Sequence, residues 1–218
     1  MYSREIEEYK KKLKLSESQK EALFGLLLGD ACLETQNKGH TYRLKIEQSV
    51  QHRAYVDHLY VLFSDWVLTP PRIRNVVSAS SHSENVAFQT VSHSAFRFYA
   101  QQFYAGGRKQ VPRLVHRWLT PASMAYWFMD DGSIKSKESK AVLFNTQGFT
   151  NAEVTRLTQI MQAKFGLETS VRKQKEGCQI YVSGNSYERF VELVSPFIIA
   201  EMRYKLPLPR KARTNTFA

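Results

Sequence analysis

The chain has 218 residues, which is long enough for one domain or for two fused halves of about 100 residues each. Its hydrophobic content of 43% and its aromatic content of 12% exclude a disordered chain. Thirty-one lysines and arginines against 20 acidic residues give a formal net charge of +11, which indicates a polyanionic partner such as DNA, RNA or an anionic membrane surface.

Three features bound the class of protein further. The longest apolar run, residues 22–29, is too short to cross a bilayer. Cys32 and Cys178 are too few and too far apart for a disulfide framework or a zinc site, and they fit a reducing compartment. Residues 1–12 have no apolar core, so they resemble neither a secretory signal nor a transit peptide. We therefore expect a protein that is not secreted and has no membrane partner.

The first apolar helix predicted along the chain ends in an acid. Ser18 and Glu21 have the spacing of a capping box and precede the segment ALFGLLLGDA, which places Asp30 at the helix end. Gly25 and Gly29, four residues apart, would let this helix approach a neighbour closely. The next elements predicted are a strand over 41–48, an amphipathic helix over 52–66, strands over 72–77 and 86–91, and a helix that contains SAFRF (94–98).

A second acid-ended helix follows near the middle of the chain. Thr120 suits an N-cap, Pro121 the first helical position and Gly132 the residue just past the end. Asp130 and Asp131 then lie in the last turn, where the helix dipole disfavours a carboxylate by a few tenths of a kcal/mol or more. Beyond it the sequence predicts strands over 141–147, 169–173 and 179–183, a helix over 151–165, and a closing helix that contains SYERF (186–190).

The two halves repeat the same order of elements. Each reads αββαββα, and each is followed by a lysine shortly before a proline, Lys109 with Pro112 and Lys205 with Pro207. The predicted fold is therefore α+β, with an N-terminal half at 1–118 and a C-terminal half at 119–218 that carries a basic tail. Duplicated halves usually pack about a pseudo-two-fold axis, which would bring Asp30 and Asp131 together at one end of a helix seam.

Paired carboxylates at two helix ends predict a metal site. Asp30 and Asp131 would repel each other without a cation, and hard divalent ions such as Mg²⁺ prefer carboxylate and carbonyl oxygens. A metal between paired acids and a phosphodiester is the arrangement of metal-assisted hydrolysis.

The strands predict the nucleic-acid surface, because a β-ribbon fits the major groove of DNA and presents every second side chain to base edges. Acid-free basic stretches at 67–83, 103–118 and 202–218 agree with this prediction. For each single side chain, an ordinary solvated strand face is an equally good reading. The candidate DNA contacts are Gln36, Arg43, Lys45, Arg72, Arg74, Lys135, Lys137, Arg172, Gln174, Gln179 and Tyr181.

With these motifs in place, the chain resembles a single-chain, two-motif LAGLIDADG homing endonuclease. The first motif is LFGLLLGDA (23–31) and the second is MAYWFMDDG (124–132), within LTPASMAYWFMDDG, which is similar to the branch that includes the yeast mitochondrial intron endonuclease. The likeness extends from about residue 15 to residue 207. Tyr126 and Asp130 stand where the motif usually has small residues, so we expect looser packing of the second helix, with the Asp130 side chain facing outward or capping local structure.

The resemblance implies a double-strand cut in a long, asymmetric DNA site, made by a monomer whose two sheets form a DNA-binding saddle and leaving short 3′ overhangs. It implies that Asp30 and Asp131 bind the metal, one for each strand, with the backbone carbonyls of Gly29 and Asp130. Lys109 and Lys205 match the basic residue that each half places near its scissile phosphate. Glu47 and Asn145 match strand positions at the periphery of the site. The implied cofactor is Mg²⁺, with Mn²⁺ as a substitute and Ca²⁺ bound without cleavage.

Two alternatives share this fold. Some members of the family are RNA maturases that assist the splicing of group I introns, and a two-domain transcriptional regulator of the same fold is the second alternative. Retention of both acids and both lysines favours the nuclease, because a protein that only binds has no need of them. The family's usual home predicts a mitochondrion or chloroplast if the gene lies in an organellar intron, and the cytoplasm otherwise.

Overall fold

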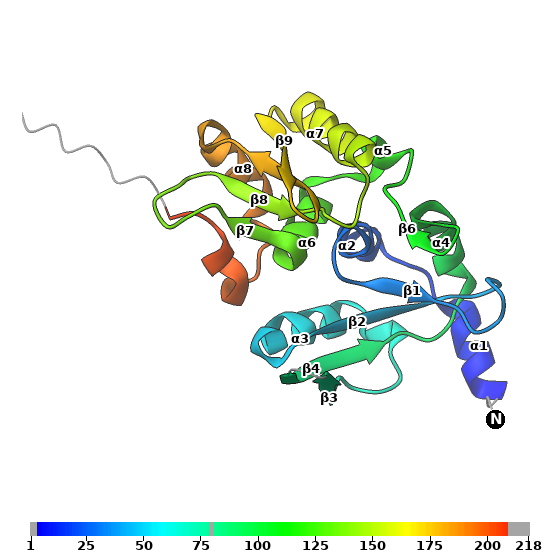
Figure 1. Ribbon diagram of the computed structural model, residues 1–218. Coiled ribbons are helices and arrows are strands. Elements are labelled where there is room, and N and C mark those ends of the chain that lie inside the picture. The colour runs from blue at the N-terminus through cyan, green and yellow to red at the C-terminus, as the bar shows by residue number, and fades with distance from the viewer. Residues whose placement is uncertain (1–3, 79–80, 209–218) are drawn as a thin grey trace, which may run out of the picture.

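The fold consists of two halves of the same topology that meet along a pair of central helices (Figure 1). The computed structural model describes residues 4–78 and 81–208. In the first half the elements are α2 (Glu17–Leu28), β1 (Cys32–Glu34), β2 (Arg43–Ser49), α3 (Arg53–Leu62), β3 (Arg72–Ser78), β4 (Ser81–Gln89) and α4 (Arg97–Phe103). Their antiparallel sheet has the order β1-β2-β4-β3.

The second half repeats this arrangement. Its elements are α6 (Pro121–Asp131), β7 (Gly132–Ile134), β8 (Val142–Asn145), α7 (Asn151–Phe165), β9 (Thr169–Gln174), β10 (Gly177–Val182) and α8 (Tyr187–Val194), and its sheet has the order β7-β8-β10-β9. The predicted α+β fold with two αββαββα halves is therefore confirmed. The boundary between residues 118 and 119 stays a prediction, and the basic tail lies largely outside the described residues.

Further elements lie outside the repeat. Among them are α1 (Arg4–Lys12), the hairpin of β5 (Tyr104–Ala105) and β6 (Arg108–Lys109), α5 (Val115–Trp118) and the 3₁₀ helix Ala200–Lys205. The hairpin turns through Gly106 and Gly107, whose φ angles of 57° and 78° belong to the left-handed region that glycine adopts without strain. This tight turn brings Lys109 back toward the interface between α2 and α6, which we call the seam. Lys205 reaches the same interface at the end of a 3₁₀ helix.

The helices α2 and α6 pack at backbone contact distance. A Cβ added to Gly25 would lie 2.1 Å from the carbonyl oxygen of Ser123 and 2.9 Å from the Cβ of Tyr126, and one added to Gly29 would lie 2.4 Å from Oδ2 of Asp130. The expectation of looser packing was therefore wrong, because each bulky residue of the second motif lies opposite a glycine of the first. The ring of Tyr126 leaves the seam, and its hydroxyl lies 3.1 Å from Nε2 of His58 on α3.

Caps define both central helices. Thr120 caps α6 with Pro121 at its first position, as predicted, and the helix runs through Asp131 to Gly132. At α2 the prediction was wrong by two residues, since the capping box joins Ser16 and Gln19. The side chain of Gln19 has tertiary partners as well: its Nε2 donates to the carbonyl of Leu62 and its Oε1 accepts from the indole of Trp66.

Aromatic residues fill the core behind the seam. The ring centroid of Trp127 lies 4.4 Å from that of Phe144, and Phe128 lies edge-on to Phe144 and Phe190 at 5.3 and 5.0 Å. All four are fully buried. The aromatic run before Asp131 is therefore core packing that anchors α6 to its own sheet.

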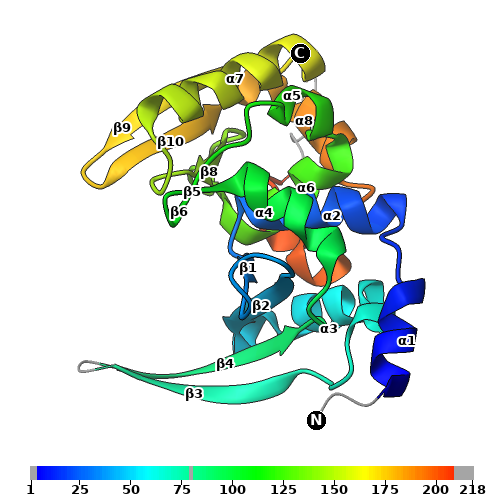
Figure 2. The same ribbon diagram turned by 90° about the vertical axis from the view of Figure 1, so that its right-hand side faces the viewer.

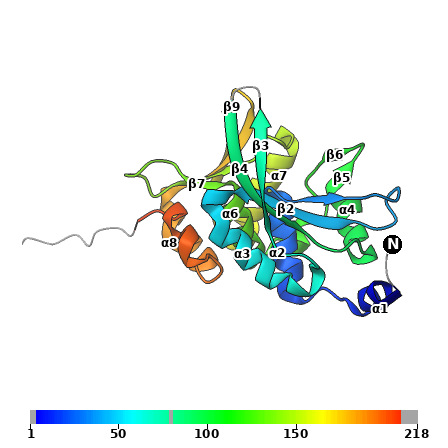
Figure 3. The same ribbon diagram turned by 90° about the horizontal axis from the view of Figure 1, so that it is seen from below.

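The two long hairpins point to the same side of the molecule. Figure 2 shows β3–β4 and β9–β10 projecting together on either side of the shorter central strands, and Figure 3 shows the same hairpins from below. The helices α3 and α7 cover the opposite face of their sheets (Figure 1). Within residues 4–78 and 81–208, no helix is long and apolar enough to span a membrane.

Candidate active site

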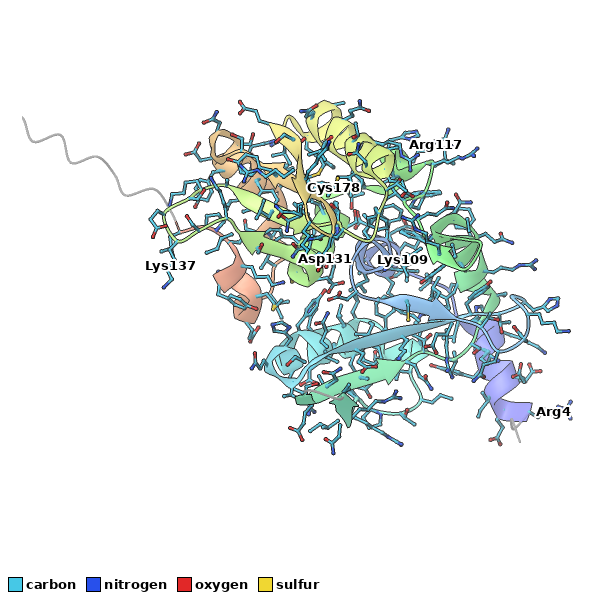
Figure 4. The ribbon with its side chains drawn as sticks, viewed as in Figure 1. Arg4, Lys109, Arg117, Asp131, Lys137 and Cys178 are labelled. Atoms are coloured by element: carbon cyan, nitrogen blue, oxygen red, sulfur yellow. The ribbon has the colours of Figure 1, made fainter. Side chains whose placement is uncertain are left out.

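The seam brings both predicted acids to one end of the central helices. Asp30 follows α2 and Asp131 ends α6, so both lie where the helices enter their first strands. A pocket of about 280 Å³ is lined by Gly29, Asp30, Lys109, Asp131 and Asn145 among others. Figure 4 shows Asp131 and Lys109 near the centre of the molecule, where the two halves meet. The predicted approach of two helix ends from distant segments is thus observed, and their role as one active site stays a prediction.

Each lysine binds the carbonyl end of one central helix. Nζ of Lys109 donates to the carbonyl oxygens of Gly29 at 2.5 Å and Ala31 at 3.0 Å. Nζ of Lys205 donates to those of Met129 at 2.5 Å and Asp130 at 2.9 Å. A cation is favoured at the negative end of a helix dipole, so the lysines have a structural reason to lie there.

The charges at the site are poorly compensated. Burial first, and then the neighbouring charge of Asp30, raise the pKa of Asp131 to about 7. The same two causes raise the pKa of Asp130 well above its ordinary value. Burial lowers the pKa of Lys109 and of Lys205, although the nearby aspartates act in the opposite direction. Burial and the neighbouring charge of Asp30 thus destabilise the ionised acids, and a cation between the two helix ends would stabilise them.

The donor set fits a hard divalent cation with open coordination positions. Among the described residues there is no group of three or more histidine, cysteine, aspartate or glutamate side chains arranged to hold a metal. Protein ligands would then be two carboxylates and backbone carbonyls, which leaves room for water and phosphate oxygens, as Mg²⁺ prefers. The carbonyls of Gly29 and Asp130 each accept from a lysine, yet a carbonyl oxygen has a second lone pair for a metal.

Two placements were expected for the Asp130 side chain, and the outward one was wrong, because the side chain lies inside the seam and accepts a backbone N–H at the end of α2. Its Oδ2 accepts a hydrogen bond of 3.1 Å from the backbone N–H of Asp30. The reason is the missing side chain at Gly29, which leaves space for the carboxylate between the two helix ends.

Gln48 also belongs to the site, although it was not among the residues predicted from the sequence. Its Nε2 donates to Oδ2 of Asp30 at 2.8 Å, and its Oε1 lies 3.5 Å from Nδ1 of His52. A signal for it exists, because Gln48 follows Leu44 and Ile46 on the core-facing side of β2. A polar residue in register with buried apolar ones, at the strand end beside Asp30, requires a polar partner.

The two peripheral residues differ in position. Asn145 lines the pocket, and its Oδ1 accepts from Nε2 of Gln179 at 2.6 Å. Glu47 lies on the open face of its sheet, where it accepts from Asn85 at 3.0 Å and pairs with Lys45 at 3.2 Å. The hydrogen bond from Asn85 is the main cause that lowers the pKa of Glu47.

The predicted DNA contacts of the first half line the open face of its sheet and the adjacent loop. Arg43 pairs with Glu34 at 2.9 Å, while Arg72 and Arg74 are exposed on β3. Register places Lys45 opposite Gln89, and so adds a polar residue to this face that the sequence did not single out. Gln36 is exposed between β1 and β2.

In the second half, the open face carries a cluster around one aromatic ring. The guanidinium carbon of Arg172 lies 3.6 Å from the ring centroid of Tyr181, and Nζ of Lys135 lies 5.9 Å from it. Register pairs Arg172 with Gln179 on the same face. Lys137 and Gln174 are exposed near the ends of β7 and β9, so all the predicted contacts of this half lie on or beside its sheet.

Twin αββαββα halves with an acid at each central helix end are the architecture of a homing endonuclease, and comparison with known proteins identifies the family. Residues 20–190 match the model of the LAGLIDADG DNA endonuclease family, so the chain belongs to that family. It is 35% identical over 214 residues to the probable intron-encoded endonuclease 1 of Wickerhamomyces canadensis. This alignment covers 94% of this chain and 90% of that protein. It is 28% identical to the DNA endonuclease I-ChuI of Chlamydomonas applanata, covering 89% of this chain and 96% of that one.

Solved structures agree with this assignment. The homing endonuclease I-WcaI bound to its DNA recognition sequence superposes with a TM-score of 0.90 at 33% identity, covering 95% of this chain and 94% of that one. Proteins named as mRNA maturases are also relatives, for example cytochrome b mRNA maturase bI2 of Debaryomyces hansenii at 26% identity over 88% of this chain and 74% of that protein.

Proposed function

We propose that the protein recognises a long, asymmetric site in double-stranded DNA and, as a monomer, makes a metal-dependent double-strand break that leaves short 3′ overhangs. The observation that carries the proposal is that the active site has two halves at one end of the seam. We call each a half-site of the protein: Asp30 with Lys109, and Asp131 with Lys205. Two half-sites in one chain match two scissile phosphates on two strands.

Each half-site contributes an acid, a carbonyl and a lysine. Asp30 and Asp131 hold the metal together with the carbonyls of Gly29 and Asp130. Bound Mg²⁺ supplies water activation and charge stabilisation at the phosphodiester. Mn²⁺ substitutes for it, and Ca²⁺ binds without supporting the cut. The lysines, fixed at the helix ends, place positive charge beside the phosphate as it reacts.

The DNA lies along the open faces of the two sheets, between the projecting hairpins (Figure 2). Basic side chains on this surface contact phosphates and fix the register, while glutamines and arginines reach base edges. The cluster of Arg172, Lys135 and Tyr181 joins charge with an aromatic surface on one half. Glu47 and Asn145 line the approach to the reacting phosphates.

The alternative activity, assistance of group I intron splicing as an RNA maturase, uses the same fold. An RNA-binding protein does not require an acid at the end of each central helix, nor a lysine fixed beside each. The intact pair of half-sites favours cleavage as the activity of this chain. The name of one relative, a probable intron-encoded endonuclease, supports a gene within an intron, and an organellar intron would make this a protein of the mitochondrion or chloroplast.

The test is to incubate the purified protein and Mg²⁺ with a genomic or randomised DNA library and to sequence the cut ends. The proposal predicts one family of related sites, cut on both strands with a constant short 3′ stagger, and no cutting in EDTA. Binding of group I intron RNA without DNA cleavage would establish the maturase reading instead.

A further inference from the structure

The main chain holds the two active-site acids differently. The helix α6 stays helical through Asp131, and the N–H of Gly132 still bonds the carbonyl of Phe128. The helix α2 ends earlier, at Leu28, and Gly29 leaves the helical region with φ −93° and ψ −134°. Asp131 is therefore fixed by its own helix, whereas Asp30 lies one step beyond the end of its helix.

The backbone donor of Asp30 is satisfied from the other half of the protein. On α2 the N–H of Gly29 bonds the carbonyl of Gly25, and the N–H of Ala31 bonds that of Leu26. Between them, the N–H of Asp30 points to Oδ2 of Asp130, 3.1 Å away on α6. A side-chain oxygen of Asp130 thus takes the place of the helical carbonyl that the early end of α2 removes.

The same carboxylate shares a donor with the carboxylate of Asp30. Nε2 of Gln48 lies 2.8 Å from Oδ2 of Asp30 and 3.5 Å from Oδ1 of Asp130. The Asp130 side chain therefore fixes Asp30 through its backbone directly and through its carboxylate by way of Gln48. No reciprocal contact reaches Asp131, because the position that corresponds to Asp130 in the first motif is Gly29, which has no side chain.

We propose that the Asp130 side chain is a positioning residue for the Asp30 half-site, so that one acid of α6 serves the opposite strand cut while its neighbour Asp131 serves its own. The inference rests on the proposed function. It makes the two half-sites unequal: removal of the Asp130 carboxylate slows the cut that depends on Asp30 and leaves the cut that depends on Asp131 unchanged.

The first test uses the protein without metal or DNA. Hydrogen exchange of the Asp30 amide is measured by NMR in the wild type and in Asp130→Ala, Asp130→Leu and Asp130→Asn. Asp130→Asn keeps a side-chain oxygen as acceptor and should preserve protection of the amide. Asp130→Ala and Asp130→Leu should lower it by about fivefold to tenfold, the size expected for the loss of one hydrogen bond. Unchanged protection in both apolar variants would overturn the proposal.

The second test resolves the two strands of the target found with the wild type. Asp30→Asn and Asp131→Asn identify which strand depends on which acid. Asp130→Ala should then slow the Asp30-dependent strand about tenfold or more relative to the other, while Asp130→Asn restores the wild-type ratio. Equal slowing of both strands, or an Asn variant as slow as Ala, would contradict the proposal. Asp57→Ala, which removes an exposed acid on α3, is the matched control and should leave the ratio unchanged.

These tests separate the inference from the proposed function. A wild-type protein that cuts no DNA overturns the function, yet the amide exchange still decides whether Asp130 fixes Asp30. A wild-type protein that cuts both strands, with an Asp130→Ala variant of unchanged strand ratio, keeps the function and removes the positioning role.

Discussion

The ammonium of Lys109 donates a hydrogen bond of 2.5 Å to the carbonyl oxygen of Gly29, and Lys205 donates one of 2.9 Å to the corresponding carbonyl oxygen of Asp130 on the other helix. The two lysines lie on unrelated local structures: Lys109 on a hairpin with a two-residue turn, and Lys205 on a 3₁₀ helix. What the halves share is the placement of one ammonium at each helix end, as a two-cut mechanism requires.

Removal of either ammonium should slow cutting without loss of DNA affinity. For Lys109→Met we expect a rate on the order of 100-fold lower on one strand, because one fixed charge beside the reacting phosphate is lost. Lys109→Arg keeps the charge and should be less impaired. Strand-resolved single-turnover kinetics measure both effects, and a Met variant that cuts both strands at the wild-type rate would remove Lys109 from the mechanism.

The seam between α2 and α6 should tolerate no added atom at Gly25. In Gly25→Ala the new Cβ would lie 2.1 Å from the backbone oxygen of Ser123, so the helices must separate. We expect a loss of about 3 kcal/mol or more in the free energy of unfolding, at the upper end of the cost of overpacking. Gly148→Ala is the matched control, since its Cβ would meet no atom within 4 Å. Equal urea midpoints for the two variants would contradict this account of the seam.

The raised pKa of Asp131 predicts a pH dependence of stability. The pKa of Asp131 in the folded protein, about 7, exceeds its ordinary value of 3.8. Between these two pH values the folded state therefore holds a proton that the unfolded state has lost. The contribution of this group is therefore fully present below about pH 4 and is lost as the pH rises to about 7. Urea unfolding in EDTA should show this decrease in the wild type and a smaller one in Asp131→Asn. Identical slopes for the two proteins would contradict the predicted shift.

The charged hairpin of the first half should contribute to DNA affinity through phosphate contacts. We expect Arg74→Ala to weaken binding and to reduce the slope of log K against log salt by about 1, the value for one lost phosphate contact. Lys20 lies on α2 near its start, at the end of the seam remote from Asp30, and Lys20→Ala should leave the slope unchanged. Titrations at several salt concentrations give both slopes, and equal slopes would place Arg74 away from the DNA.

Local periodicity and the internal repeat of the sequence were enough to predict the order of the elements and the positions of the two helix-end acids. Asp30 and Asp131 were found because each follows an apolar helix, and the repeated order of elements placed them on one axis. Sequence could not place the side chain of Asp130, because its direction depends on the empty space opposite, at Gly29 of the other half. This is tertiary information that no pattern within one motif contains.

Two further sequence predictions, the start of β4 and the cap of α2, were wrong because contacts with distant segments decided the structure. The start of β4 at Ser81 lies in the polar segment SHSEN, which pairs with β3 beyond the apolar core and so lacks an alternating pattern. At α2 two capping boxes overlap in sequence, and Ser16 with Gln19 prevails because Gln19 also bonds residues of distant segments. In each case a contact remote in sequence decides between local alternatives.

The central claim is that one chain carries two acids, each responsible for one strand of a double-strand break. The most direct measurement is cutting of an end-labelled target by the wild type, Asp30→Asn and Asp131→Asn in Mg²⁺, with each strand resolved and DNA affinity measured in parallel. If each acid serves one strand, both variants should bind DNA with largely unchanged affinity, and neither should make a double-strand break. Wild-type cutting of both strands by both variants would contradict it.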